Sequence, residues 1–371
     1  EPRGEWFDYY ERVQFNHMLA HQRPDSGMFA YFIPMETGAR RDWSTPEDSF
    51  WCCVGSGMES HAKHADSIYW QGGRTLFVNL FISSTLDWTD KGLKLDLDTA
   101  YPMDGDIALA VARAPRRAMT IALRIPAWSP DARLRLNGEA VVAERRDGYA
   151  FITRRWQAGD KLKLSLDMPL RAEPIAGDPT TLAFVSGPLV LAADLGPADR
   201  PFDDTPPALL AEGDPAAVLA PISGKPHHFR LTPVMGAPVE MKPFFPLYDR
   251  RTAVYFRTFT PQSWATGKTQ YLADEAARAD LVRRTVDIFH IGEMQPERDH
   301  GFESTRSEPG QFYARSSRRL PAGETMRFRL ARRPGVVAAL PRHRAHSHRR
   351  RGDCGRCPRR RRRRRGERAR P

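Results

Sequence analysis

The chain has 371 residues, enough for two or three domains with substantial cores. Its formal net charge of +12 would suit a nucleic-acid binder, but residues 341–371 hold fifteen arginines against two acidic residues. That segment alone carries +13, so the remainder is near neutral at −1. The composition therefore excludes a protein that is basic throughout, and no apolar stretch is long enough to cross a bilayer as a helix.

Two helices are expected near the N-terminus. The first covers Trp6–Gln22, with an apolar face made of Trp6, Tyr10, Val13 and His17. A strand-like apolar run follows at Met28–Met35, and a second, shorter helix is expected over Met58–Ala65, with Met58, Ala62 and Ala65 directed inward. Because two helices cannot bury an apolar face alone, we expect a further helical domain before residue 1 in the complete protein.

From about residue 76 the apolar spacing changes from the helical period to strand alternation. Asn137-Gly138 is typical of a type I′ hairpin turn. Short strands at regular spacing with turns between them predict a β-sandwich over residues 71–195. The segments with this alternation are 76–82, 93–97, 107–111, 121–125, 134–136 and 162–170.

The C-terminal half has a weaker pattern. Residues 196–228, rich in Pro, Ala, Gly and Asp, are expected to form a linker or long loop. Residues 229–332 are expected to form a second sandwich-like domain, in which a polar group at 293–300 is interpreted as a strand-end cluster rather than a metal site. The chain is thus predicted to be mainly β with a small α part.

The tail, residues 333–371, contains a run of seven arginines, Arg359–Arg365, and from residue 341 onward it has almost no apolar side chains. Such a segment cannot bury a core and is expected to be a disordered tail. A nucleic-acid arm is the alternative function, and an out-of-frame translation is a third explanation. We do not expect nucleic acid to be the partner, since charge blocks are more often only solvated.

Cys52 and Cys53 are adjacent, and Gly55-Ser56-Gly57 follows them. Neighbouring cysteines rarely form a disulfide with each other, because the bond strains the peptide between them. We expect the glycines to form a tight turn and the next helix to direct its amides at the sulfurs, which would favour thiolates. Two interpretations stay open at this point: a reactive or zinc-binding pair, and small buried side chains beside a helix start.

Seven motifs follow one another along the chain. They are Asp8-x-x-Glu11-Arg12-x-x-Phe15-Asn16, Gly27-Met28-Phe29-x-Tyr31-Phe32, Ser49-Phe50-Trp51-Cys52-Cys53-x-Gly55-Ser56-Gly57-x-Glu59, Asp66-Ser67-Ile68-Tyr69, Arg124-Ile125-Pro126-x-Trp128, Gly187-Pro188-Leu189-Val190 and Gly292-Glu293-x-Gln295-Pro296-Glu297-x-Asp299-His300. In this order they resemble the β-L-arabinofuranosidases of glycoside hydrolase family 127 and its sister family 146. The likeness covers about residues 5–330.

The resemblance implies a retaining glycosidase that uses a cysteine in place of the usual carboxylate nucleophile. Cys52 would be the nucleophile, Cys52 and Cys53 would both bind zinc, and Glu11 would contact the sugar. Without the resemblance, Glu11 would be interpreted as a helix carboxylate paired with a neighbour such as Arg12. Residues 1–70 would then be the end of a helical (α/α)6 toroid, followed by two jelly-roll-like sandwiches.

Two hypotheses for the function of the chain therefore remain. The first is release of terminal β-L-arabinofuranose from plant-type glycans, with low activity because the family's Glu-x-Cys motif and its acid/base glutamate have no counterpart in these 371 residues. The second is a non-catalytic carbohydrate-binding or dimerisation module, possible as a homodimer through the β domains. No membrane partner is expected, and no signal peptide is visible at the start of the sequence, which leaves localisation open.

Overall fold

The structure is a computed structural model that describes residues 2–47, 51–202, 204–284, 308–309 and 318–319. The arginine run, the polar group at 293–300 and the motif residues Ser49 and Phe50 lie outside these ranges. The chain divides into two compact units, Glu1–Ala279 and Asp280–Pro371. Within the second unit the described strands are β21 (Glu308–Pro309) and β22 (Arg318–Arg319), which pair antiparallel.

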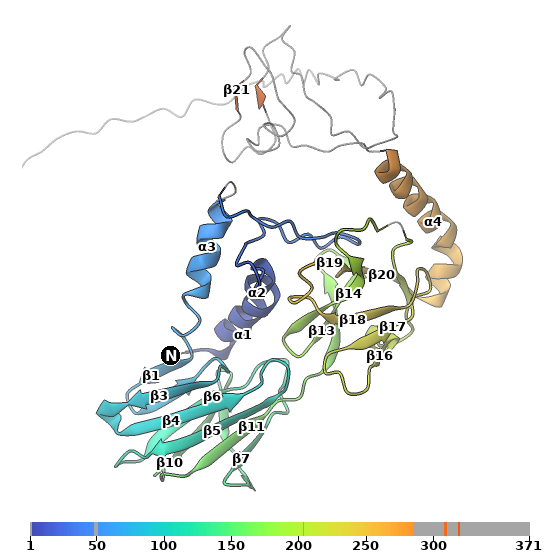
Figure 1. Ribbon diagram of the computed structural model, residues 1–371. Helices are drawn as coiled ribbons and strands as arrows, with labels where there is room; N and C mark the ends of the chain where they lie inside the picture. Colours follow the sequence, from blue (N-terminus) through green and yellow to red (C-terminus); the bar gives the residue numbers. More distant parts are fainter. Residues whose placement is uncertain (1, 48–50, 203, 285–307, 310–317, 320–371) are drawn as a thin grey trace, which may run out of the picture. The chain divides into compact units, whose positions relative to one another are not determined.

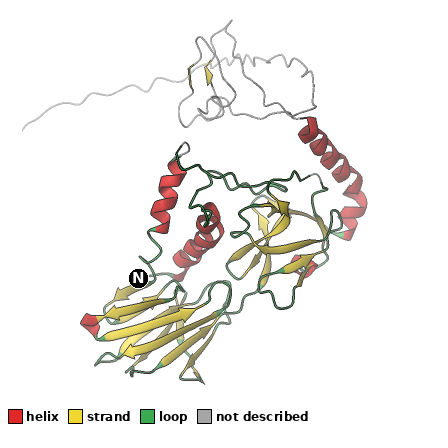
Figure 2. Cartoon of the chain, in the orientation of Figure 1, coloured by secondary structure: helices red, strands yellow, loops and turns green. Residues whose placement is uncertain are grey.

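The first unit is mainly β with few helices, as predicted (Figure 2). The predicted N-terminal helix is confirmed as one helical segment made of α1 (Gly4–Val13), a π-helical turn η1 (Gln14–Met18) and α2 (Leu19–His21). The other described α-helices are α3 (Cys52–His61) and α4 (Pro261–Arg284), and short 3₁₀ turns are η2 (Thr89–Lys91) and η3 (Pro215–Val218). None of the helices in the described ranges is both long and apolar enough to span a membrane.

The predicted inner face of the first helix is wrong. Trp6 is 50% exposed and His17 is also exposed, whereas the buried positions are Gly4, Phe7, Glu11, Asn16, Ala20 and His21. The apolar pattern was misleading because Glu11 and Asn16 are polar, and they are buried by hydrogen bonds rather than by an apolar stripe.

Two sheets follow the helices and share one core (Figure 1). One sheet has the strand order β1-β2-β6-β10-β9, and the other has the order β3-β4-β5-β11-β7-β8. All their pairings are antiparallel except β2 with β6. Their strands are β1 (Tyr69–Gly72), β2 (Thr75–Val78), β3 (Ser84–Trp88), β4 (Leu93–Thr99), β5 (Asp106–Arg113), β6 (Met119–Arg124), β7 (Arg133–Leu136), β8 (Glu139–Ala140), β9 (Glu144–Arg146), β10 (Tyr149–Arg154) and β11 (Lys161–Ser165).

The alternation in the sequence predicts the core of these sheets. Buried and exposed residues alternate along β4, β5 and β11, with the leucines, isoleucines and valines inside. The hairpin at Asn137-Gly138 is confirmed, since both residues have positive φ (51° and 92°) between β7 and β8.

A third, nine-stranded sheet has the order β15-β20-β13-β14-β18-β17-β16, with β12 beside β13 and β19 beside β14. Its pairs are antiparallel except β15 with β20. The strands are β12 (Leu170–Ile175), β13 (Asp178–Ser186), β14 (Leu189–Pro197), β15 (Ala208–Leu210), β16 (Leu219–Pro221), β17 (Phe229–Leu231), β18 (Val239–Pro243), β19 (Arg250–Ala253) and β20 (Phe256–Phe259).

The strands of this sheet and the helix after it differ from the predicted segment boundaries. Residues 170–197 pair with strands beyond residue 207, although the sequence pattern had grouped them with the first β region. The expected linker 196–228 contains β15 and β16, which belong to the sheet. The expected β region after residue 229 includes the 24-residue helix α4.

Candidate functional site

The cysteine pair lies in the first turn of α3, which begins at Cys52. This corrects the expectation that the cysteines and glycines precede a helix starting at Met58. Cys52 is exposed and Cys53 partly exposed, both thiols are free, and their Sγ atoms are 3.7 Å apart. A disulfide would hold the sulfurs about 2.05 Å apart, so the pair is reduced and close.

Burial raises the pKa of the Cys53 thiol, and the hydrogen bond and charge of Cys52 act in the same direction. These effects on the Cys53 pKa oppose the thiolate that the nearby helix amides were expected to favour. Two neighbouring thiols resist losing both protons because their negative charges would repel. A cation beside both sulfurs would reverse that preference.

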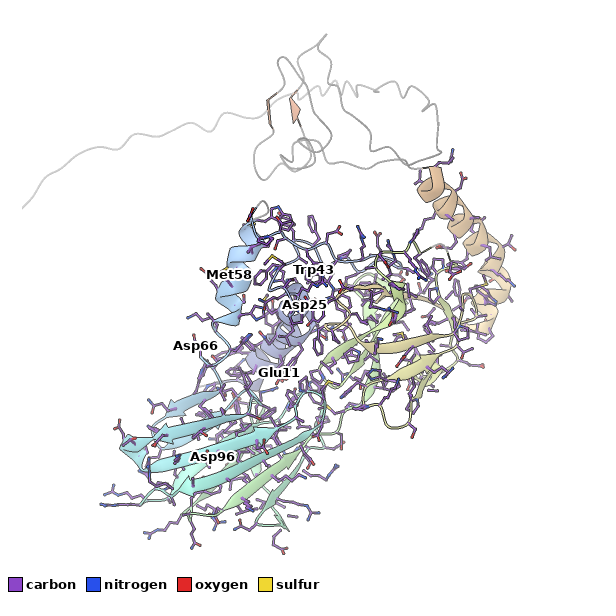
Figure 3. All side chains as sticks on the ribbon, viewed as in Figure 1. Glu11, Asp25, Trp43, Met58, Asp66 and Asp96 are labelled. Atoms are coloured by element: carbon purple, nitrogen blue, oxygen red, sulfur yellow. The ribbon has the colours of Figure 1, made fainter. Side chains whose placement is uncertain are left out.

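Gly57 allows α3 to pack closely against the segments that carry His21 and Phe29. A methyl group placed on Gly57 would lie 2.5 Å from His21 Cε1 and 2.5 Å from the ring of Phe29, so only glycine permits this contact. Gly55 has open space at the same point. Met58, Ala62 and Ala65, predicted to face inward, are exposed; Met58 is labelled on α3 in Figure 3.

The expected strand at Met28–Met35 is replaced by two isolated bridges, Gln22 with Phe29 and Ala30 with Trp43. The loop is held instead by Arg41, a buried cation that donates to the carbonyls of Ala20, Phe244 and Phe245 at 2.8–3.1 Å. Backbone groups of this loop thus find side-chain and bridge partners without a regular strand.

Four histidines lie along the contact between α3 and the first helix. His17 and His21 stack with ring centroids 6.1 Å apart, and His61 Nδ1 is 3.0 Å from His64 Nε2. Phe29 lies between the two pairs, 5.0 Å from His21 and 6.0 Å from His61. Burial, followed by the neighbouring histidines, lowers the pKa of His21 to about 4. His21 is therefore neutral at physiological pH.

A pocket of about 810 Å³ lies between the outer face of the first helix and α3. Its lining is mainly apolar, and it includes Trp6, Tyr9 and Tyr10 from α1 together with Glu59 and Lys63 near the end of α3. Trp6, Tyr10 and Val13, which the sequence pattern assigned to the helix's inner face, thus line an open pocket.

Glu11, which the resemblance implies to contact the sugar, is 3% exposed and faces the β sheets (Figure 3). One of its oxygens accepts a hydrogen bond from Arg124 of β6, and the other accepts one from the Tyr101 hydroxyl at 2.7 Å. Arg124 also donates to Asp8 at 2.6 Å and to the Asn79 carbonyl at 2.6 Å. The proposed neighbour Arg12 pairs with Glu173 instead, at 2.7 Å.

Burial raises the pKa of Glu11, while the Arg124 charge and the Tyr101 hydrogen bond act in the opposite direction. Arg124 is wholly buried, and the carboxylates of Glu11 and Asp8 keep its pKa high against the effect of burial. The arginine therefore stays charged and requires both acidic partners.

Sequence reasoning missed the role of Arg124, although a signal was present. Arg124 ends the apolar strand sequence Ile121-Ala122-Leu123, where a charge is costly unless it is paired. Asn16 was also missed. Its amide donates to the Arg12 and Pro188 carbonyls at 2.9 and 2.8 Å and accepts from Val190 N at 2.7 Å, which fixes the π-helical turn to the nine-stranded sheet.

The cysteine pair supplies two donors that could hold a metal. No group of three or more His, Cys, Asp or Glu side chains suited to a metal ion is found within the described ranges. Glu11 is not with the pair, since its hydrogen-bond partners are Arg124 and Tyr101. The structure thus places Cys52 beside Cys53, whereas it places Glu11 in contact with Arg124 and Tyr101.

Two domain models match the chain. The model described as the β-L-arabinofuranosidase GH127 catalytic domain covers residues 1–66, and the GH127 middle-domain model covers residues 75–168. The second match ends just before β12, where the nine-stranded sheet begins.

A non-reducing end β-L-arabinofuranosidase of Bifidobacterium longum subsp. longum is 27% identical over 229 residues, which is 55% of this chain and 33% of that protein. The GH127 β-L-arabinofuranosidase of Geobacillus stearothermophilus T6 has a similar fold, with a TM-score of 0.52 and 23% identity over 70% of this chain and 47% of its own.

A second solved GH127 β-arabinofuranosidase has a TM-score of 0.57 and 21% identity over the same shares of the two chains. The chain thus spans about a third of the curated relative and about half of the solved structures. Residues 1–66 and 75–168 thus match the catalytic and middle domains of glycoside hydrolase family 127, which identifies this part of the chain as a fragment of that family, and the solved structures share its fold.

Proposed function

We propose that this chain carries the nucleophile side of a zinc-dependent retaining glycosidase site that acts on terminal β-L-arabinofuranose. Cys52 is the nucleophile, and Cys52 and Cys53 are two of the zinc ligands. The substrate class is taken from the non-reducing end β-L-arabinofuranosidase that the chain resembles.

The observation that carries the proposal is the 3.7 Å separation of the two Sγ atoms. Two sulfurs bound to one tetrahedral zinc at about 2.3 Å are about 3.8 Å apart. The exposed edge of Cys52 and the partial burial of Cys53 support the division of roles, because the attacking sulfur must reach a substrate.

The reaction has two steps. The Cys52 thiolate attacks the anomeric carbon, a carbon–sulfur bond forms, and the glycosidic oxygen leaves with the bonding electrons and takes a proton from solvent. Water then attacks the same carbon, the carbon–sulfur bond breaks, the sulfur leaves as thiolate, and the proton that water loses returns to solvent. Two inversions give overall retention. Zinc bound to both sulfurs would keep them deprotonated, against the raised pKa of Cys53.

We expect slow turnover from these 371 residues. Two sulfurs are half of the usual four zinc donors, and a Glu-x-Cys motif is not found in the sequence. Loss of the proton donor to the leaving group would reduce the rate by a further factor of about 10²–10⁴.

We assign Glu11 a positioning role, because both its oxygens already hold Arg124 and Tyr101. Together with Asp8, Glu11 holds α1 against the two sheets formed by β1–β11, here called the middle sheets. We further propose that the exposed apolar face around Trp6 and Tyr9 is the side of the helix that packs in an (α/α)6 toroid, and that the two β regions are jelly-roll-like sandwiches.

The test uses a leaving group that needs no proton. With 2,4-dinitrophenyl β-L-arabinofuranoside and zinc, we expect a burst of one phenolate per chain and a mass increase of one pentosyl group on the Cys52 peptide. Methyl β-L-arabinofuranoside, whose leaving group needs protonation, is the matched substrate and should give no burst.

Cys52→Ser should abolish the burst and the adduct, whereas Cys53→Ser should weaken zinc dependence and leave a reduced burst. An adduct on Cys53 with none on Cys52 would contradict the assigned roles. A burst that survives Cys52→Ser, or no burst with zinc at saturation, would contradict the proposed function.

A further inference from the structure

A second pocket, of about 580 Å³, lies beside the nine-stranded sheet and shares no lining residue with the cysteine pair. Strand β20 and the residue before it supply Tyr255, Arg257 and Phe259, and α4 supplies Tyr271, Glu275 and Arg278. Helix α4 and strand β20 are both labelled in Figure 1. The volume is within the range of small-molecule sites.

One wall of the pocket is aromatic. The rings of Phe259 and Tyr271 meet edge to face with centroids 5.3 Å apart, and Trp264 packs on Phe259 at 5.0 Å. Tyr255 is 39% exposed. Rings held rigidly by one another present apolar faces at small entropic cost, which suits the flat C–H face of a sugar ring.

Polar groups on the same wall are free to bind. In the described part of the chain, the Tyr271 hydroxyl has no hydrogen-bond partner and neither Glu275 nor Arg278 forms an ion pair. Burial, and then the charge of Glu275, raises the pKa of Tyr271, so the phenol remains a donor. A donor, a carboxylate and a guanidinium on one side can satisfy several hydroxyl groups.

The charges of the pocket nearly cancel. Arg257 is already paired with Asp178 at 3.0 Å, and Gln270 donates to Asp274 at 2.8 Å. The lining holds two arginines against Glu36, Asp274 and Glu275, a balance of −1. This balance offers little attraction to a phosphate or an acidic sugar and favours a neutral ligand with many hydroxyl groups.

We propose that the pocket between β20 and α4 binds a neutral sugar residue, as a glycan-binding site separate from the cysteine pair. The site does not depend on Cys52 chemistry. It would hold a distant part of a glycan whose terminal sugar reaches the cysteines, or retain the chain on the glycan without hydrolysis.

The test is calorimetric titration with methyl β-L-arabinofuranoside and, in parallel, with inorganic phosphate. We expect the glycoside to bind and phosphate not to bind. Tyr271→Ala should weaken glycoside binding about tenfold, and Glu275→Gln should weaken it less. Val142→Ala, a change at a fully exposed side chain that lines neither pocket, should have no effect. The Cys52→Ser, Cys53→Ser double variant should bind as the parent does.

Tyr271→Phe distinguishes a loss of sugar contacts from a loosening of α4, because it keeps the ring and removes only the hydroxyl. It should weaken binding measurably while the thermal midpoint stays unchanged. The proposal is overturned if the double cysteine variant loses binding while Tyr271→Ala keeps it, if phosphate binds in preference, or if the glycoside does not bind the parent chain. A failed burst at Cys52 with intact glycoside binding would count only against the catalytic function.

Discussion

Arg124 of β6 and Glu11 of α1 form a fully buried ion pair that joins the helical segment to the middle sheets. Asp8 and Tyr101 complete the cluster, so each charged group has a partner of opposite charge or a hydroxyl donor. At its other end the same helical segment is fixed by Asn16 to the turn at Pro188. The first helix thus has polar anchors on two different β regions.

Arg124→Leu should destabilise the chain by about 3–5 kcal/mol, because it leaves the buried Glu11 and the partly buried Asp8 without their cation. Urea unfolding at neutral pH measures this change. Arg12→Leu is the matched control: its pair with Glu173 is partly exposed and should be worth at most about 1 kcal/mol. Equal losses in the two variants would contradict the buried cluster.

Gly57→Ala should destabilise the chain by about 1–3 kcal/mol, since the added methyl group meets His21 and Phe29 at 2.5 Å. Gly55→Ala is the same substitution two residues earlier in α3, in open space, and should stabilise by up to about 1 kcal/mol. Thermal unfolding distinguishes them. If both variants are stabilised, α3 does not pack on His21 as described.

Acidification should destabilise the chain through His21. Its pKa is about 4 in the folded chain against about 6.5 when unfolded, so in this window the unfolded state takes up the proton first. Stability is therefore complete above about pH 6.5 and lost as the pH falls toward about 4, with a loss of about 2 kcal/mol between about pH 7 and about pH 5.

Urea midpoints at several pH values measure this loss. His21→Gln cannot titrate and should remove the His21 part of the slope over that interval, while His17, His61 and His64, whose pKa values burial also lowers, should keep a smaller remainder. His228→Gln, at a partly exposed histidine bonded to the Pro226 carbonyl, should leave the slope unchanged. An unchanged slope in His21→Gln would assign the effect to other groups.

Much of the β architecture could be predicted from the sequence, because alternating side chains report which face is buried. The leucines of β4 and β11 and the turn at Asn137-Gly138 are examples. The pairing of β13 with β20, in which Thr181 lies opposite Arg257, 76 positions later, could not, since local periodicity carries no information on distant partners.

The cysteine pair could be singled out from the sequence, because adjacent cysteines are rare and the order of the motifs indicated the family. The roles of Cys52 and Cys53 stay predictions. The helix start was misplaced because glycine disfavours helix interiors, whereas here Gly57 is required by the contact with His21. The partner of Glu11 was misplaced because Arg12 is a neighbour in sequence and Arg124 is a neighbour only in the folded chain.

The most direct test of the cysteine assignment is zinc X-ray absorption spectroscopy with one equivalent of zinc. Cys354→Ser and Cys357→Ser remove the remaining cysteines, so any sulfur signal comes from Cys52 and Cys53. We predict two sulfur ligands at about 2.3 Å, and none after Cys52→Ser with Cys53→Ser. A zinc ion surrounded by nitrogen and oxygen alone in the chain that keeps both cysteines would contradict a zinc-thiolate site.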